Sequence, residues 1–203
     1  MRRRLRILAV VLAFLLLAGC SKESGPSESQ PDYFPLQLGN QWTFTVTKPD
    51  SAGEDSTYTE IQTVDHTTQY DSLEWFVVVK TTETDTDSTY YRRGDYFLEA
   101  IFFYQGAILE DIIAVSPLEP SVGFVWSDTV NIEVEGEVVA ETTITVPAGT
   151  FDCFEEHLLV SALGGLVRLE ITNYLADGVG PVKIVYVSSG DTTDMELTEY
   201  SLQ

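Results

Sequence analysis

Residues 42–47 read WTFTVT, and this stretch decides the fold class. Large apolar side chains alternate here with three threonines, so that every second residue is apolar. A period of two places the apolar side chains on one face of an extended strand. Aromatic and β-branched residues also favour strands. The stretch therefore predicts a half-buried β-strand over residues 41–48, with Trp42 in the core and Thr43 facing outward.

The same alternation continues along most of the chain. Clusters of turn-forming residues separate the alternating runs, at Pro147–Gly149, Gly164–Gly165 and Ser189–Asp191. Proline fixes its own φ angle and glycine readily adopts positive φ, so these clusters reverse the chain. Within the runs, Val146 is expected in the core and Thr145 outside. The predicted strands cover residues 41–48, 56–65, 73–84, 88–93, 95–104, 130–135, 140–146, 151–162, 166–174, 181–187 and 192–202.

Two stretches are less regular. Gly136 is expected to turn the chain between the strands at 130–135 and 140–146. Residues 107–115 are the one candidate for a turn or two of helix, because they fit no clean alternation.

These patterns predict an all-β domain over residues 33–203. About ten or eleven strands joined by short turns would form an antiparallel meander, and so wide a sheet must curl, close or split to protect its edges. We therefore expect a curved antiparallel meander sheet or an incomplete barrel.

The sequence also contains one short internal similarity, which we call the echo. Residues 38–42 (LGNQW) are matched by residues 122–126 (VGFVW), and a Pro-Leu pair precedes each copy. In both, glycine would make a turn and tryptophan would begin a strand. The echo indicates either an internal duplication or a chance similarity between two strand entries.

The N-terminus has the layout of an export signal. Four arginines among residues 2–6 precede an apolar run over residues 7–17, well short of the roughly 20 residues that a transmembrane helix needs. The run ends in Leu-Ala-Gly-Cys, which resembles a bacterial lipobox. That resemblance implies cleavage before Cys20 and attachment of diacylglycerol to its sulfur. The alternative is an ordinary secretory signal that ends near a cysteine.

The expected organisation is a signal peptide at 1–19, a lipidated cysteine and flexible tether at 20–32, and the β domain at 33–203. The tether is polar and would span about 20 Å. By analogy with enterobacterial sorting, Ser21 favours the outer membrane of a Gram-negative cell. The predicted location is thus the cell envelope, with Cys20 as the membrane anchor.

The net charge of the chain limits the classes of partner that it can bind. The leader holds four of the eleven basic residues and none of the 32 acidic ones, which leaves a net charge of −25 after residue 19. Phosphate backbones are bound by clustered Lys and Arg, so no nucleic-acid partner is expected. Such an excess of acid is typical of a solvated, repulsive surface.

Three blocks carry a resemblance. YFPLQLGNQWTFTV (33–46), TVPAGTFDCF (145–154) and YLADGVGPVKI (174–184) resemble the recurring blocks of a family of uncharacterised bacterial lipoproteins. The resemblance implies a curved antiparallel β domain, distantly similar to the LolA/LolB lipoprotein carriers, and brings no catalytic residues. Asp177 departs from the family pattern, in which Pro or Lys is common before the glycine.

Catalytic motifs are absent from the sequence, which has only two histidines, His66 and His157. A strand would place Glu155 and His157 on one face, where the pair could serve a hydrolase or simply form an outward ion pair. Cys153 is expected to be a small buried side chain rather than a nucleophile.

Glu83, Asp85 and Asp87 would point the same way from a strand. They could hold Ca²⁺ through oxygen ligands, or they could be a solvated edge that discourages pairing with another chain. The stretch departs from the EF-hand template, because Ser88 stands where that loop needs glycine.

We therefore expect a lipid-anchored envelope protein with a binding or structural role, no catalytic activity, no cofactor and no metal. Its curved sheet would hold an apolar ligand or a protein partner, as the many aromatic residues suggest. The alternatives are an envelope hydrolase that uses His157 with an acid, and a scaffold without a ligand.

Overall fold

The computed structural model describes residues 30–50, 53–104, 107–129 and 132–203. These residues form twelve β-strands and one short 3₁₀ turn, so the predicted all-β class is confirmed, with one or two more strands than expected. The strands are β1 (Gln41–Pro49), β2 (Asp55–Tyr70), β3 (Leu73–Thr81), β4 (Thr86–Arg93), β5 (Phe97–Tyr104), β6 (Ala107–Pro117), β7 (Val125–Thr129), β8 (Ile132–Val146), β9 (Gly149–Ala162), β10 (Val167–Ala176), β11 (Gly180–Ser188) and β12 (Asp191–Ser201). No helix in the described ranges is long and apolar enough to cross a membrane.

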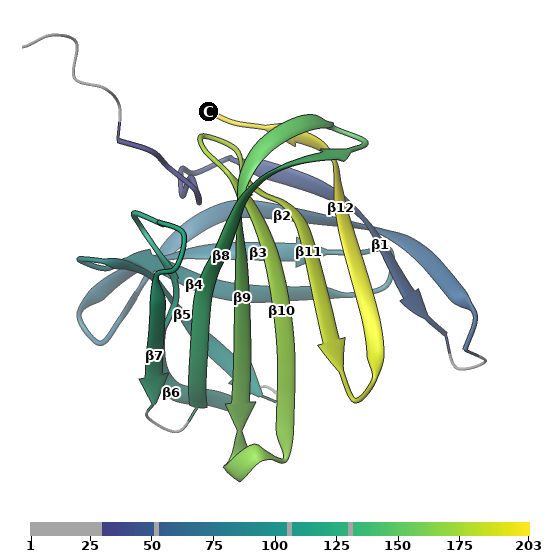
Figure 1. Cartoon of the computed structure of the whole chain (residues 1–203). Coiled ribbons are helices and arrows are strands. Elements are labelled where there is room, and N and C mark those ends of the chain that lie inside the picture. Colours follow the sequence, from purple (N-terminus) through teal and green to yellow (C-terminus); the bar gives the residue numbers. More distant parts are fainter. Residues whose placement is uncertain (1–29, 51–52, 105–106, 130–131) are drawn as a thin grey trace, which may run out of the picture. The chain divides into compact units, whose positions relative to one another are not determined.

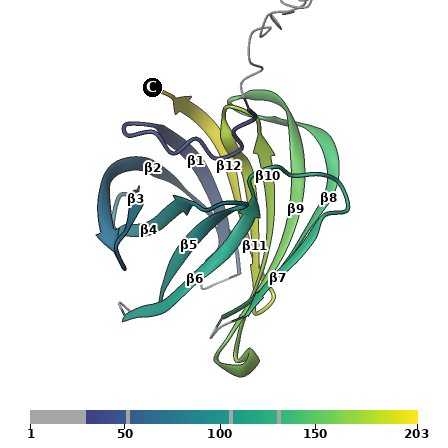
Figure 2. The same cartoon turned by 90° about the vertical axis from the view of Figure 1, so that its left-hand side faces the viewer.

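All twelve strands belong to one antiparallel sheet that curves into a nearly closed barrel (Figures 1 and 2). Its order is β6-β5-β4-β3-β2-β1-β12-β11-β10-β9-β8-β7, so chain neighbours pair except at the centre, where β1 meets β12. The sheet thus consists of two six-stranded meanders joined side by side, and its two free edges are β6 and β7.

Side chains bridge the seam between those two edges. The Asp128 carboxylate accepts the backbone N–H of Ala114 at 3.0 Å, and the Trp126 indole N–H donates to the Ala114 carbonyl at 3.3 Å. Strand β7 therefore satisfies both backbone groups of one β6 residue without a ladder of hydrogen bonds. An exposed edge would otherwise invite pairing with another chain.

The alternation in WTFTVT has the predicted result. Trp42, Phe44 and Val46 have no more than 1% of their surface exposed, while the intervening threonines are half-buried. Val146 is likewise buried and Thr145 is exposed.

Two element predictions are wrong. Residues 107–115 lie in strand β6 rather than in a helical turn, because they complete an antiparallel pair with β5. Pairing of this kind commonly overrides weak local preference.

Gly136 does not turn the chain either, since β8 continues through it. It lies opposite Trp126, and a Cβ at this position would overlap the indole ring. The absence of a side chain at Gly136 therefore leaves room for the Trp126 indole ring. Val130 and Asn131 lie outside the described residues.

The two meanders repeat one local arrangement. Trp42 and Trp126 are each the second residue of the first strand in their half. Before each of them, the glycine of the echo has positive φ, 89° at Gly39 and 84° at Gly123.

Backbone hydrogen bonds extend the match. In each half, the glycine donates its N–H to a valine carbonyl, and the same valine donates its N–H to the residue after the glycine. The bonds are Gly39 to Val64 (2.8 Å) and Val64 to Asn40 (2.9 Å), and Gly123 to Val138 (2.8 Å) and Val138 to Phe124 (2.9 Å). The strand pairing then shifts register directly after each valine. These matching contacts support the duplication rather than chance, although superposition of the halves stays a prediction.

Candidate functional site

The interior of the barrel contains a chamber of about 330 Å³, which we call the inner chamber. Its wall is drawn from β2–β6 and β9–β11, together with Phe34 from the segment before β1. The volume equals about eleven water molecules of liquid and lies at the lower end of ligand-binding cavities.

Much of the wall is apolar because every second residue of each strand points inward. The apolar lining includes Leu98, Val115, Leu158, Val160, Leu169 and Ile171. These side chains come from strands of both meanders, so the chamber exists only when the sheet has curled. Transfer of a hydrocarbon group from water to such a wall is worth about 25 cal/mol per Å² of apolar surface.

A wider space of about 610 Å³, which we call the mouth, borders one end of the chamber. The two share Lys80, Asp87 and Tyr186. The β3–β4 turn brings Glu83 and Asp85 to the mouth, β1 brings Lys48, and β2 brings Glu60. A largely apolar chamber therefore adjoins a space with a charged lining.

Lys80 lies at this junction. Among the described residues, no carboxylate forms an ion pair with its ammonium group. Burial by itself lowers the pKa of Lys80, but the nearby Tyr91, Tyr186, Glu60 and Asp87 outweigh burial and hold the pKa above its ordinary value. The side chain is thus a retained positive charge inside the barrel.

Glu156 is the second unusual polar group. It is fully buried on the interior face of β9, and its Oε1 accepts a hydrogen bond from the Ser116 hydroxyl at 2.8 Å. Its Oε2 has no hydrogen-bond partner. Burial raises the pKa of Glu156 to about 8, against the opposing effect of Ser116 and Asn173, so the carboxyl is mostly protonated at neutral pH. Ser116 and Asn173 both line the inner chamber.

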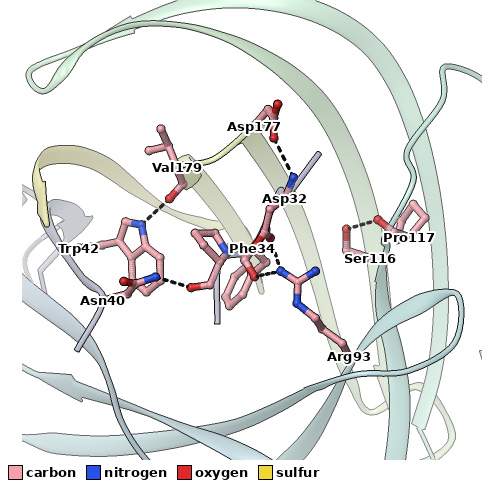
Figure 3. A network of polar contacts seen from close by, with 10 residues as sticks. Asp32, Phe34, Asn40, Trp42, Arg93, Ser116, Pro117, Asp177 and Val179 are labelled. Atoms are coloured by element: carbon pink, nitrogen blue, oxygen red, sulfur yellow. Dashed lines mark hydrogen bonds and ion pairs between the residues drawn. The ribbon is translucent and has the colours of Figure 1, made fainter. Parts of the chain in front are cut away.

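The other end of the chamber is closed by the segment that leads into β1. Phe34 lines the chamber and packs against Tyr91 and Trp42, with ring centroids 4.9 and 6.0 Å away. Figure 3 shows the polar contacts that hold this segment across the barrel end. Arg93 binds Asp32 and donates to the Phe34 carbonyl at 2.9 Å.

Further contacts attach the same segment to the turn between β10 and β11. The Asp32 N–H donates to Asp177 at 2.7 Å, and the Asp32 carbonyl accepts the N–H of Gly178 at 2.8 Å. Trp42 completes this region through its indole N–H, which donates to the Val179 carbonyl at 2.6 Å. The stretch of residues 32–34, which begins with the last residue of the predicted tether, therefore closes this end of the barrel, and we call it the stopper. Asp177 is one of its anchors.

The structure separates the predicted site residues. Cys20 lies outside the described residues. His157 bonds Glu155 at 2.8 Å on the partly exposed outer face, as the strand geometry predicted, and no hydroxyl of the described residues bonds the imidazole. Cys153 is buried, and burial raises the pKa of its thiol to about 11, which suppresses the reactive thiolate.

The acidic stretch differs from expectation. Glu83 and Asp85 do not share a strand with Asp87, because Thr82 to Asp85 form a turn in which the Thr82 N–H donates to the Asp85 carbonyl at 2.9 Å. The Thr82 hydroxyl also accepts the N–H of Asp85, a local bond that competes with strand pairing. No cluster of three metal-ligating side chains occurs within the described ranges.

Sequence reasoning missed Lys80 and Glu156, although a signal was present for each. Glu156 interrupts the inward row that includes Leu158 and Val160, and Lys80 follows Val78 on the inward face of β3. A charged residue in an otherwise apolar row indicates a buried polar group.

No protein-family profile and no curated protein matches the chain. Among solved structures, it is similar to a protein from Bacteroides fragilis assigned as exported, with a YmcC-like fold (TM-score 0.51, 14% identity, covering 85% of this chain and 100% of that one). The fold is YmcC-like. A protein from Parabacteroides distasonis assigned as a lipoprotein is similar as well (TM-score 0.50, 13% identity, 84% and 99% coverage). The three sequence blocks and the likeness to LolA/LolB are not shown by these matches and stay predictions.

Proposed function

We propose that this chain is a lipid-anchored protein of the cell envelope that holds an apolar ligand inside its barrel without chemically changing it. The observation that carries the proposal is the inner chamber, a largely apolar cavity that adjoins the polar mouth. Cavities that bind small molecules have this composition, with a mostly apolar wall and a few polar groups that fix orientation.

The protonated Glu156 fits the same role. Its unpartnered Oε2 leaves a buried polar group beside the chamber, and such a group costs about 1–3 kcal/mol unless it finds a partner. Glu156 itself does not line the chamber, but Ser116, which donates to its Oε1, and Asn173 do, so these two residues are the polar contacts that a ligand would meet there.

The test uses a soluble Cys20→Ser chain and an apolar fluorophore, N-phenylnaphthylamine. We expect saturable binding of one molecule per chain. Leu169→Trp fills the chamber and should abolish binding. Leu166→Trp is the matched control, because Leu166 is 86% exposed. Absence of saturable binding, or equal loss in both variants, would contradict the proposal.

The location rests on the N-terminal signal, and the exported and lipoprotein assignments of the two similar structures agree with it. We propose that Cys20 carries the lipid and that the outer membrane of a Gram-negative cell receives it. Two acyl chains anchor a protein stably in a membrane, and the Cys20→Ser variant lacks the sulfur that would carry them. Membrane fractionation with palmitate labelling should place the unmutated chain in the outer membrane and the variant in the soluble fraction. A labelled, membrane-bound Cys20→Ser chain would reject the lipobox.

A further inference from the structure

We infer that the ligand is an amphiphile with a zwitterionic head group, whose anionic part binds at Lys80 and whose cationic part lies outward among the acids of the mouth. This inference rests on the proposed function, because it assigns the head group of a ligand whose tail occupies the inner chamber. The chemistry is that of a phosphate diester joined to an ammonium group.

The path of the ligand follows from the shared residues. Lys80, Asp87 and Tyr186 border both spaces, so a ligand with its tail in the inner chamber and its head in the mouth would pass beside them. The opposite end is occupied by Phe34. Strand β1 shows that these ends are distinct, because Trp42 lies near the stopper whereas Val46 and Lys48 line the mouth. A chain can therefore enter with its tail first and keep its head at the mouth.

The charges along this path have an order. Lys80 is the positive group next to the inner chamber, and the Tyr186 hydroxyl beside it stays protonated because burial raises its pKa. The second lysine of the mouth, Lys48, lies over the Tyr58 ring, 5.1 Å from its centroid. Together they offer donors to an anion in a region of low dielectric, where charge-assisted hydrogen bonds are strong. Glu83 and Asp85 lie farther out, in the exposed β3–β4 turn.

Other head groups fit this order poorly. An anion without a balancing charge meets Glu60 and Asp87 close to Lys80, as well as the outer acids. A cation is attracted to the rim but repelled by Lys80, and an uncharged head leaves the ammonium without a partner. A head with its anion inward and its cation outward meets an opposite charge both at Lys80 and at the outer acids Glu83 and Asp85.

The experiment compares head groups on one tail. Dodecyl phosphocholine, dodecyl sulfate, dodecyl trimethylammonium and dodecyl maltoside are titrated calorimetrically, below their micellar concentrations, into the soluble Cys20→Ser chain. We expect the zwitterion to bind most tightly. In Lys80→Gln its affinity should fall about tenfold or more, the value of a charge-assisted hydrogen bond. Glu83→Gln, which removes one of the outer acids, should also weaken the zwitterion relative to the maltoside.

Arg168→Gln is the control, since Arg168 lies on the outer surface and pairs with Glu170. It should leave the ranking unchanged. Equal binding of all four amphiphiles, or tightest binding of the sulfate, would overturn the head-group inference while leaving the chamber as a binding site. Failure of all four to bind would overturn the proposed function itself. If Lys80→Gln fails to fold, the order of the four affinities for the Cys20→Ser chain still tests the head-group inference.

Discussion

At the scale of single residues, Glu156 contributes a pH dependence that is unusual for an acid. The unfolded carboxyl titrates near 4.5, whereas the folded one titrates at about 8. Between these values the folded chain holds a proton that the unfolded chain has released. Stability therefore falls as the pH rises through this window, and it levels off above it.

The corresponding variant is Glu156→Gln, which keeps the shape of the side chain without an ionisable proton. The unfolding free energy of the unmutated chain should fall by up to about 1.4 kcal/mol per pH unit because of Glu156, and the variant should lack this fall. The stability of the variant relative to the unmutated chain should therefore increase between pH 6 and pH 8. Urea unfolding of both chains at the two pH values measures the difference. An equal difference in unfolding free energy between the two chains at both pH values would show that Glu156 is ionised or hydrated in the folded chain.

Trp42 combines burial with a buried hydrogen bond, since 1% of its surface is exposed and its indole N–H reaches the Val179 carbonyl. Trp42→Ala should cost about 3–5 kcal/mol of unfolding free energy. Thr43→Ala, its half-buried neighbour, should change it by less than about 1 kcal/mol. Chemical denaturation compares the two. A loss of under about 1 kcal/mol for Trp42→Ala would place the indole outside the core.

At the scale of elements, the seam depends on contacts between two edge strands, β6 and β7, that do not pair with each other. Asp128 supplies the partner of the Ala114 N–H, so Asp128→Ala should destabilise the chain by about 1–3 kcal/mol. Asp128→Asn keeps an accepting oxygen and should cost less. Equal effects of the two variants in urea unfolding would mean that the carboxylate does not hold the seam.

The element predictions succeeded wherever alternation reported on a single face. WTFTVT gave the correct strand and the correct inward residues. Gly136 was misread because its small size serves Trp126, a residue ten positions earlier on the neighbouring strand. Local sequence does not distinguish a glycine that turns the chain from one that makes room.

At the scale of the whole molecule, the site escaped sequence reasoning because curling of the sheet creates it. Lys80 lies on β3 and Tyr186 on β11, far apart in the chain, and both border one opening. The sequence shows that Glu156 interrupts an apolar row, but only the closed fold shows that this row faces a chamber. The repeat, by contrast, was visible in the sequence, since Trp42 and Trp126 mark matching strand entries.

The central claim is that the inner chamber is occupied in the cell. Native mass spectrometry of the chain purified gently from its own membrane tests this most directly. We predict a non-covalent mass at near-stoichiometric level, in addition to the lipid proposed at Cys20, that is released when the chain unfolds and is missing from Leu169→Trp. A folded chain that carries only its covalent mass, in the unmutated protein as in the variant, would contradict the account.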